Sequence, residues 1–348
     1  MPVRTPSGLR DHVVPFVAGD GFGCNLIHVT GQRSPSKGPV LLVHGAGVRA
    51  NIFRAPVRRT LVDELLDDGW DVWLENWRAS IEFTRNQWTL DQAAVHDHPA
   101  AVRTVMEQTG ARDVRAVIHC QGSTSFMMSA VAGLVPQVTT ILSNAVSLHP
   151  VVPISAGVKL HLAVPMIARF TPYLDCQWGV HSPTLFAKAL TAFVKVTHRE
   201  CANTVCRYAS FLYGVGFPTL WRHENLNDET HDWLTAEFAA VPLTFFDQIH
   251  RSVRQGRLIP VEERPELPPR FGVDPPRTEA RIAFFAGEKN RCFLPESQSR
   301  TFRYFDAHRP GYHAMHLLPG YAHLDVFMGK DAARDVFPIM LDELNRTH

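Results

Sequence analysis

The stretch Val114-Arg-Ala-Val-Ile-His-Cys-Gln-Gly-Ser123 is a short apolar strand that runs directly into a turn of small residues. The residues from Gln121 to Val135 then have the composition of a helix. A sharp turn from a strand into a helix presents a side chain at the edge of a sheet, and its usual form is G-x-S-x-G. Here Cys120 takes the central position, Gly122 follows, and Ile118 stands where a glycine is usual. The pattern predicts a nucleophile at Cys120.

A thiol suits this position chemically. Free N–H groups and the dipole at the start of a helix stabilise a thiolate, so the sequence predicts a lowered pKa for Cys120. The alternative is that Cys120 is a small buried apolar residue, as free cysteines often are. Ser123 and Ser125 are rival nucleophiles, but both lie in the first turns of the predicted helix, where hydroxyls bind backbone groups.

The chain around this turn carries no charge. No Asp, Glu, Lys or Arg occurs between Arg115 and Lys159. A membrane span needs about 20 mostly apolar residues in a row. The best window, Phe126 to Leu142, is interrupted by serine, threonine, glycine, glutamine and proline. The uncharged segment therefore indicates the centre of a sheet that is covered on both faces.

Strand-like and helix-like patterns alternate on both sides of this centre, which is typical of a parallel, doubly wound α/β sheet. The predicted strands are 39–44, 70–74, 114–119, 138–146, 281–286 and 313–318, and the predicted helices are 60–68, 90–110, 121–135, 296–305 and 332–344. Residues 150–258 lose this rhythm and look largely helical, with many aromatic residues. We predict an α/β core of residues 1–149 and 259–348, and a helical cap or lid of residues 150–258.

A glycine-rich loop, Val43-His-Gly-Ala-Gly-Val48, follows the first buried strand. Such a loop can direct backbone N–H groups at a developing oxyanion, and Ala46 and Gln121 are the predicted donors. A phosphate-binding loop is the rival interpretation, but G-K-[ST] is missing. The predicted substrate-binding residues are two in this loop and three aromatic residues in the cap: Gly45, Val48, Phe211, Phe217 and Trp221.

A histidine and its partner are predicted in loops after the last two strands. His323 in Gly320-Tyr-Ala-His-Leu-Asp325 lies where a base reaches the nucleophile turn. The loop Gly287-Glu-Lys-Asn-Arg291 places Asn290 where an aspartate is usual. An asparagine can orient a histidine by accepting from its ring N–H through the amide oxygen. Glu288 is the second candidate for this role.

With these motifs in order, the chain resembles the α/β-hydrolase superfamily. More narrowly, it is similar to the hydrolase domain associated with GMC-type (cholesterol-oxidase-like) oxidoreductases, on His119 to Thr124, Gly287 to Arg291 and Gly320 to Gly329. Trp70 to Arg78 is similar to acid lipases, and polyhydroxyalkanoate synthases share a cysteine at the turn. The resemblance implies the α/β-hydrolase fold with a helical lid, and esterase activity.

Composition limits the classes of partner. The chain has 348 residues, 35 Lys and Arg against 34 Asp and Glu, and a net charge of +1. This balance argues against binding to nucleic acid or to an anionic membrane surface, and no stable membrane insertion is expected. A homodimer is compatible with the sequence. The N-terminus lacks the apolar core of a signal peptide, so a cytoplasmic location is expected.

No metal or cofactor is expected. Cys201 and Cys206 lie close together in the sequence, but a metal site needs a second pair of ligands, and the sequence offers none at matching spacing. Buried structural thiols are the favoured interpretation of this pair.

The sequence thus predicts a cysteine-dependent carboxylic ester hydrolase that acts on an apolar acyl or sterol-like ester through a thioester. An acyltransferase or thioesterase with the same Cys120–His323 site is the first alternative. A non-catalytic ligand-binding protein of the same fold is the second.

Overall fold

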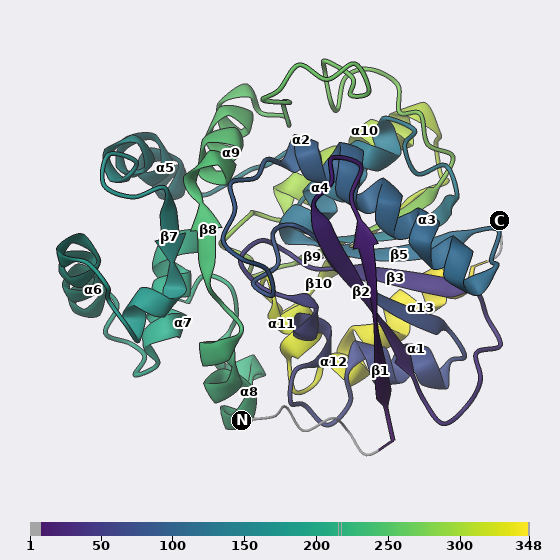
Figure 1. The fold of residues 1–348 in the computed structure, drawn as a ribbon, viewed down its shortest axis with the longest axis horizontal. Helices are drawn as coiled ribbons and strands as arrows, with labels where there is room; N and C mark the ends of the chain where they lie inside the picture. Colours follow the sequence, from purple (N-terminus) through teal and green to yellow (C-terminus); the bar gives the residue numbers. More distant parts are fainter. Residues whose placement is uncertain (1–7, 215, 217, 347–348) are drawn as a thin grey trace.

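The computed structural model describes residues 8–346 except 215 and 217, and its centre is an eight-stranded sheet. The strand order is β1-β2-β4-β3-β5-β6-β9-β10 (Figure 1). β1 and β2 are antiparallel to their neighbours, and all the other pairs are parallel. The strands are β1 Arg10–Val17, β2 Gly23–Thr30, β3 Pro39–Val43, β4 Asp71–Asn76, β5 Val114–His119, β6 Val138–Asn144, β9 Arg281–Gly287 and β10 Ala314–Leu318.

Helices cover both faces of this sheet. Figure 1 shows α3, α4 and α10 above the sheet and α1, α12 and α13 below it. The helices of this core are α1 Leu61–Asp67, α2 Leu90–Gln92, α3 His98–Thr109, α4 Cys120–Val131, α10 Glu296–His308, α11 Asp325–Met328, α12 Ala332–Asp335 and α13 Phe337–Asn345, with a 3-10 turn at Ala50–Arg54 and a π-helical turn at Ala93–Asp97. The predicted doubly wound, mostly parallel sheet is therefore confirmed.

The uncharged segment lies in the interior over the two strands β5 and β6 and the helix α4, as predicted, but its end does not, since Ile154 and Val158 are 90% and 54% exposed. β5 and β6 are inner strands of the sheet, and every residue of α4 is buried. An ionised side chain would be costly in any of these positions because both faces of the sheet are covered.

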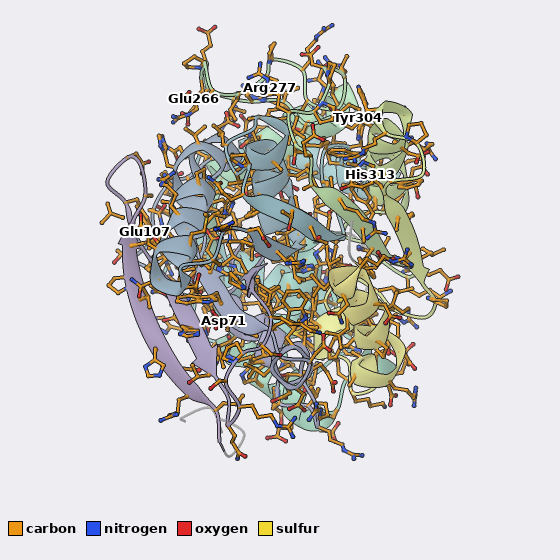
Figure 2. The ribbon with its side chains drawn as sticks, turned by 90° about the vertical axis from the view of Figure 1, so that its right-hand side faces the viewer. Asp71, Glu107, Glu266, Arg277, Tyr304 and His313 are labelled. Carbon is orange, nitrogen blue, oxygen red and sulfur yellow. The ribbon has the colours of Figure 1, made fainter. Side chains whose placement is uncertain are left out.

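The N-terminal hairpin is absent from the predicted strands. β1 and β2 form an antiparallel pair at one edge of the sheet, opposite β10 at the other edge (Figure 2). The chain did contain a signal for this hairpin, since Asp20-Gly21 separates two runs of β-branched and aromatic residues. β1 has only one fully buried residue, Phe16, so its apolar pattern is weak.

The segment predicted as a cap is largely helical and projects from one side of the sheet (Figure 1). A two-stranded antiparallel sheet, Tyr173–Asp175 (β7) with Ala240–Pro242 (β8), holds its two ends together. Its helices are α5 Ile154–Ile167, α6 Leu185–Thr197, α7 Thr204–Tyr213, α8 Asp228–Trp233 and α9 Leu243–Gln255, with 3-10 turns η3 Cys176–Gly179, η4 His223–Asn225 and η5 Leu234–Ala236. Of the helices in the described ranges, none has the length and apolar character to cross a membrane.

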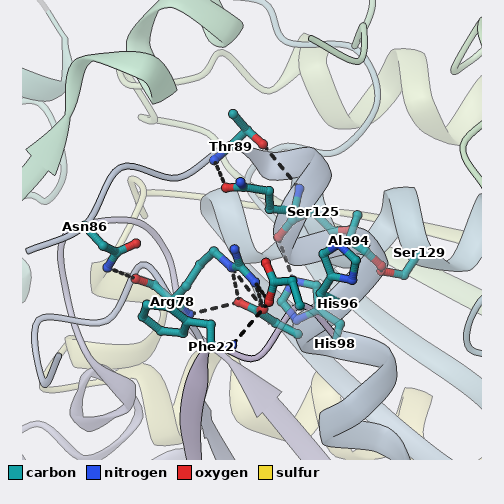
Figure 3. A network of polar contacts seen from close by, with 12 residues as sticks. Phe22, Arg78, Asn86, Thr89, Ala94, His96, His98, Ser125 and Ser129 are labelled. Atoms are coloured by element: carbon teal, nitrogen blue, oxygen red, sulfur yellow. Dashed lines mark hydrogen bonds and ion pairs between the residues drawn. The ribbon is translucent and has the colours of Figure 1, made fainter. Parts of the chain in front are cut away.

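A buried polar network fixes the loop after β4 to the π-helical turn (Figure 3). The Arg78 guanidinium donates to both oxygens of the Asp97 carboxylate, and the two side chains are almost fully buried. Deeper in the core, His98 bridges the Glu75 carboxylate at 2.9 Å and the Ser125 hydroxyl at 2.7 Å. These contacts pair the buried charges of Arg78 and Asp97, whereas Glu75 Oε2 has no hydrogen-bond partner among the described residues.

Candidate active site

Cys120 occupies the sharp turn between β5 and α4. Its φ of 55° lies in the left-handed region, which is uncommon for residues other than glycine. Gly122 is required in this turn because a Cβ there would lie 2.1 Å from the His44 carbonyl oxygen. Gly45 is required on the facing loop, because its Cβ would lie 2.8 Å from that of Cys120. Ile118 is accommodated inside β5, where it is fully buried.

Two backbone N–H groups face the Cys120 thiol. Those of Gln121 and Ala46 both lie close enough to the sulfur to lower the pKa of the thiol. The Ala46 peptide is held from its other side by the Tyr213 hydroxyl, which donates to the Ala46 carbonyl oxygen at 3.2 Å. The two donors predicted for an oxyanion therefore converge beside the sulfur, and a side chain of α7 helps to orient one of them.

His323 lies in the loop after β10 and approaches the same sulfur. The ligating atoms of His119, Cys120 and His323 all lie within 4.8 Å of one another, and all three residues are buried. The loop is anchored through its backbone, since the N–H groups of His323 and Leu324 donate to the Leu220 carbonyl oxygen at 3.2 and 2.8 Å. The base predicted from chain order is thus brought to the predicted nucleophile.

Asn290 is the side chain that contacts the far nitrogen of His323. The Asn290 Oδ1 atom accepts from the backbone N–H groups of Cys292 and Phe293 at 3.0 and 3.2 Å. The amide nitrogen must therefore point the other way, and it donates to His323 Nδ1 at 3.1 Å. An Nδ1 that accepts a hydrogen bond carries no proton, so the neutral ring has its proton on Nε2. The sequence predicts the opposite contact, in which the amide oxygen accepts from the ring.

Among the contacts of the described residues, none joins Glu288 to His323. Its side chain is exposed, accepts a hydrogen bond from the Gly320 N–H at 3.2 Å and pairs with Lys289 at 3.4 Å. Of the two predicted partners of the histidine, the structure brings only Asn290 to the ring.

Burial sets the charge state of the pair. It raises the pKa of the Cys120 thiol to about 12, and the Gln121 and Ala46 N–H groups only partly oppose this rise. Burial also lowers the pKa of His323 to about 3. The lowered thiol pKa predicted from the helix N-terminus is therefore wrong for this closed site, because desolvation outweighs the helix dipole. A neutral thiol faces a neutral imidazole.

His119 is a second histidine in the site, which sequence reasoning did not assign. Its ring centroid lies 4.8 Å from that of His323, and its Nδ1 accepts from the Asn144 amide at 2.9 Å. Its Nε2 is buried without a hydrogen-bond partner among the described residues. Its place directly before the predicted nucleophile was its sequence signal.

The rival serines are occupied elsewhere. The Ser123 hydroxyl contacts those of Ser143 and Ser147 at 2.8 and 3.3 Å. The Ser125 hydroxyl bonds to His98 and to the Gln121 carbonyl oxygen. Both serines are fully buried, so neither is presented to a substrate as Cys120 is.

A small, mostly apolar cavity of about 40 Å³ lies against Cys120. Gly45 contacts Cys120, but Val48, Phe211 and Trp221 are not among the cavity-lining residues, and Phe217 lies outside the described residues. The apolar lining comes chiefly from α5, α7 and α9, through Leu160, Leu212, Phe245, Phe246 and Ile249. These lining residues belong to the segment predicted as a cap, but the sequence did not identify the side chains themselves.

Lys159 is a charged residue of this cavity that sequence reasoning also missed. Its ammonium donates to the carbonyl oxygens of Phe211 and Gly214. Burial lowers the pKa of Lys159 to about 8. Its place at the end of the uncharged segment was a signal, since it is the first cation after a long apolar stretch.

Comparisons with known proteins relate the chain to lipases and esterases, although no family model matches it. It is 23% identical to human lipase member K over 91% of this chain and 80% of that protein, and 26% identical to human gastric triacylglycerol lipase over 88% and 79%. A shorter match, 29% identical, joins 33% of this chain to 24% of sterol esterase 2 of Saccharomyces cerevisiae. The chain thus spans about a quarter of the yeast enzyme.

Solved structures agree on the fold. A putative lipase from Sulfolobus solfataricus superposes with a TM-score of 0.61 at 14% identity, covering 99% of this chain and 96% of that one. A thermophilic esterase from Thermogutta terrifontis gives 0.57 at 12% identity, covering 96% and 98%. The chain therefore has the α/β-hydrolase fold that its sequence predicts.

Proposed function

We propose that this α/β-hydrolase-fold protein is a cysteine-dependent carboxylic ester hydrolase that acts on apolar acyl or sterol-like esters. The observation that carries the proposal is the convergence at Cys120. Its thiol sits on a left-handed turn, faces the Gln121 and Ala46 N–H groups, and lies within 4.8 Å of the ligating atom of His323. Nucleophile, oxyanion donors and base in one buried site are the parts that acyl transfer requires.

In the proposed reaction, the Cys120 sulfur attacks the ester carbonyl carbon while the thiol proton passes to His323 Nε2. The carbonyl oxygen becomes an oxyanion between the N–H groups of Ala46 and Gln121. Its collapse expels the alcohol, which takes the proton from His323, and leaves a thioester on Cys120. Water then attacks the thioester with the same proton transfers in reverse order, which releases the acid and restores the thiol.

The Asn290 contact adds a condition to this reaction. His323 Nε2 can accept a proton only if the ring proton lies on Nδ1, and that tautomer breaks the hydrogen bond from the Asn290 amide. When the aspartate of a serine triad is replaced by asparagine, the wrong tautomer costs about 10⁴ in kcat. A thiol suits this site better than a hydroxyl would, because it loses its proton far more readily. We therefore propose that the two departures from the usual triad, cysteine in place of serine and asparagine in place of aspartate, belong together.

Access to Cys120 is proposed to require movement of the helical cap. A cavity of about 40 Å³ is much smaller than the roughly 300–1,000 Å³ of a typical ligand site. Its lid-side walls are apolar side chains of α5, α7 and α9, which supports an apolar acyl chain or ring system as the substrate. The lipase and sterol esterase relatives support the same class, as does the resemblance to hydrolase domains associated with GMC-type oxidoreductases. All six cysteines are unpaired, which fits the proposed cytoplasmic location.

The proposal is tested by intact mass spectrometry after brief exposure to p-nitrophenyl esters of graded chain length. We expect an acyl adduct on Cys120 in the wild type, none in Cys120→Ala, and loss of turnover in that variant. Cys24→Ala is the matched control because it removes another buried thiol far from the turn in sequence.

The outcomes separate the alternatives. An adduct on Ser123 or Ser125, or undiminished turnover in Cys120→Ala, contradicts the proposal. A stable adduct that an added alcohol or thiol removes faster than water does would assign an acyltransferase or thioesterase with the same site. Saturable ester binding with no adduct and no turnover would assign a ligand-binding protein.

A further inference from the structure

Two cysteines and two histidines converge in the cap, away from the Cys120 site. They are Cys201 before α7, Cys206 in its first turn, His223 in η4 and His231 in α8. Their ligating atoms all lie within 4.8 Å of one another. The spacing, C-x4-C followed by two separated histidines, gave no sequence signal because η4 and α8 are brought to α7 only by the fold.

Two sulfur-to-nitrogen distances within this cluster match the edges of a tetrahedral ligand set. Cys201 Sγ lies 3.5 Å from His231 Nε2, and Cys206 Sγ lies 3.3 Å from His223 Nε2. With Zn–S of about 2.3 Å and Zn–N of about 2.0–2.1 Å, the sulfur-to-nitrogen edge of a tetrahedron is about 3.5 Å. Two separate thiol–imidazole hydrogen bonds would not require all four atoms to meet. The two imidazole rings also stand nearly perpendicular, at 84°, with their centroids 5.0 Å apart.

Contacts that do not involve the four side chains hold them in place. The Asn203 Oδ1 atom accepts from the N–H groups of Val205 and Cys206, which fixes the start of α7. The same side chain donates from Nδ2 to the His231 carbonyl oxygen at 2.9 Å and to the Thr235 hydroxyl at 3.1 Å, which fixes α7 to α8. The ligand set is therefore organised by its surroundings, as a structural metal site requires.

We propose that Cys201, Cys206, His223 and His231 form a structural zinc site. Two thiolates and two imidazoles in a tetrahedron match the preference of Zn²⁺, and four protein ligands leave no open position for catalysis. The expectation that Cys201 and Cys206 are only structural thiols is replaced by this proposal. Binding releases the two thiol protons and joins the start of α7, the 3-10 turn η4 and the helix α8.

The zinc site also lies next to the support of His323. Leu220 accepts the backbone hydrogen bonds of His323 and Leu324, and the Arg222 N–H donates to the Asp325 carboxylate at 3.2 Å. His223 directly follows Arg222, and Asn225 of the same turn donates to Asp325 at 2.7 Å. A metal at His223 would therefore hold the strip of chain on which the His323 loop rests.

The test is the metal content of the full-length, tag-free protein, purified under reducing conditions and measured by inductively coupled plasma mass spectrometry. We expect about one zinc per chain in the wild type. Cys206→Ser, His231→Gln and the double variant Cys201→Ser/Cys206→Ser should each hold less than about a tenth of that amount. His181→Gln, an exposed histidine of the same segment, and Cys24→Ser should keep the full amount.

Cys120→Ser is the decisive control, because His119, Cys120 and His323 form the other convergent group. We expect this variant to keep its zinc. Loss of zinc in Cys120→Ser, with retention in Cys206→Ser, would place the metal at the other group and overturn the proposal.

A second measurement keeps the test independent of variant folding. Wild-type protein is stripped with a chelator and a reductant and then titrated with Co²⁺. We expect one equivalent to give the thiolate-to-cobalt charge-transfer band and the intense visible bands of tetrahedral cobalt, and one equivalent of Zn²⁺ to abolish both. Failure of freshly reduced protein to take up either metal, or a Cys201–Cys206 disulfide in protein purified without reductant and free of zinc, would overturn the proposal.

Discussion

At Asn290, the orientation of one side-chain amide decides which nitrogen of His323 carries the proton. Because Oδ1 is held by two backbone N–H groups, the amide cannot turn over without losing both bonds. Replacing Asn290 by aspartate keeps those bonds and offers His323 Nδ1 an acceptor. We expect Asn290→Asp to raise kcat for a p-nitrophenyl ester at least about tenfold, with little change in KM.

Glu288→Gln serves as the matched control for Asn290→Asp, because Glu288 is exposed and has no contact with the ring. It should leave both constants unchanged. An Asn290→Asp variant that folds normally but has an unchanged kcat would show that the tautomer of His323 does not limit the reaction.

The protonation state of Cys120 gives a second prediction at this scale. Since burial raises the thiol pKa to about 12, only a small fraction is thiolate near neutral pH. We expect its alkylation by iodoacetamide, followed by peptide mapping, to accelerate about tenfold per pH unit from pH 7 to 10 with no plateau. A plateau below pH 8 would instead indicate a thiolate–imidazolium pair in the resting protein.

The convergence of the candidate site residues could be predicted from chain order, but their protonation states could not, because those states depend on burial. Cys120, His323 and Asn290 each follow a strand of the sheet, so their meeting at one edge could be inferred. The direction of the Asn290 amide depends on how the backbone turns at Cys292 and Phe293. The thiol pKa depends on the cover supplied by residues far along the chain. Neither the direction of the Asn290 amide nor the pKa of the Cys120 thiol can be predicted from a sequence pattern.

At the scale of elements, the buried ion pair between Arg78 and Asp97 joins the loop after β4 to the π-helical turn. Removing one partner of a buried pair costs about 3–5 kcal/mol. The part-exposed Asp20 carboxylate, 2.9 Å from Arg78, would compensate the guanidinium only in part after loss of Asp97. We expect Asp97→Ala to lower the free energy of unfolding in urea by about that amount. Asp113→Ala, which removes an exposed pair with Arg115, should cost less than about 1 kcal/mol. Similar losses in both variants would contradict this account.

The cap helices present apolar side chains to solvent, among them Leu162 and Met166 of α5, which are 62% and 57% exposed. If α5 contacts a lipid phase as the site opens, Leu162→Ser/Met166→Ser should reduce activity on an emulsified ester at least about fivefold. Activity on a short, dissolved ester should not change. Ser155→Ala, at an exposed polar position of the same helix, is the control. Equal losses on both substrates would remove this role from α5.

The elements that can be predicted from the sequence are the strands in which most residues are apolar. β5 runs from Val114 to His119, as predicted, and β3 differs only at its end. The edge hairpin was not predicted because most side chains of β1 are exposed, so they show no strong apolar pattern. In the cap, helices were expected but their pairing was not, because their contacts join positions with no common spacing.

For the whole molecule, buried neutral histidines predict a loss of stability in acid. Burial lowers the pKa of His44 and His323 to about 3 and that of His149 and His313 to about 4. As the pH falls below about 6.5, the histidines bind protons in the unfolded chain but not in the folded chain, so stability is lost between about pH 6.5 and 3. Asp325 opposes this in part, because burial raises its pKa to about 6.

We expect Tm to fall by roughly 10 °C between pH 7 and 4.5, measured by differential scanning calorimetry at constant ionic strength. The double variant His149→Gln/His313→Gln should flatten this acid limb, because two of these histidines are removed. A Tm that is level from pH 7 to 4.5 would contradict the prediction.

The backbone hydrogen bonds between Leu220 and the His323 loop limit how the predicted cap segment can move or be replaced. The predicted cap segment is not independent of the core. One strip of it, Leu220 to Asn225, forms hydrogen bonds that hold the loop carrying His323, the proposed base. The proposed opening would then divide the segment, with α5 and α9 moving while this strip stays in place. A chimera in which residues 150–258 are replaced by those of a relative would change the hydrogen-bond partners of the His323 loop as well as the substrate specificity. Graft boundaries that spare Leu220 to Asn225 would exchange the specificity alone.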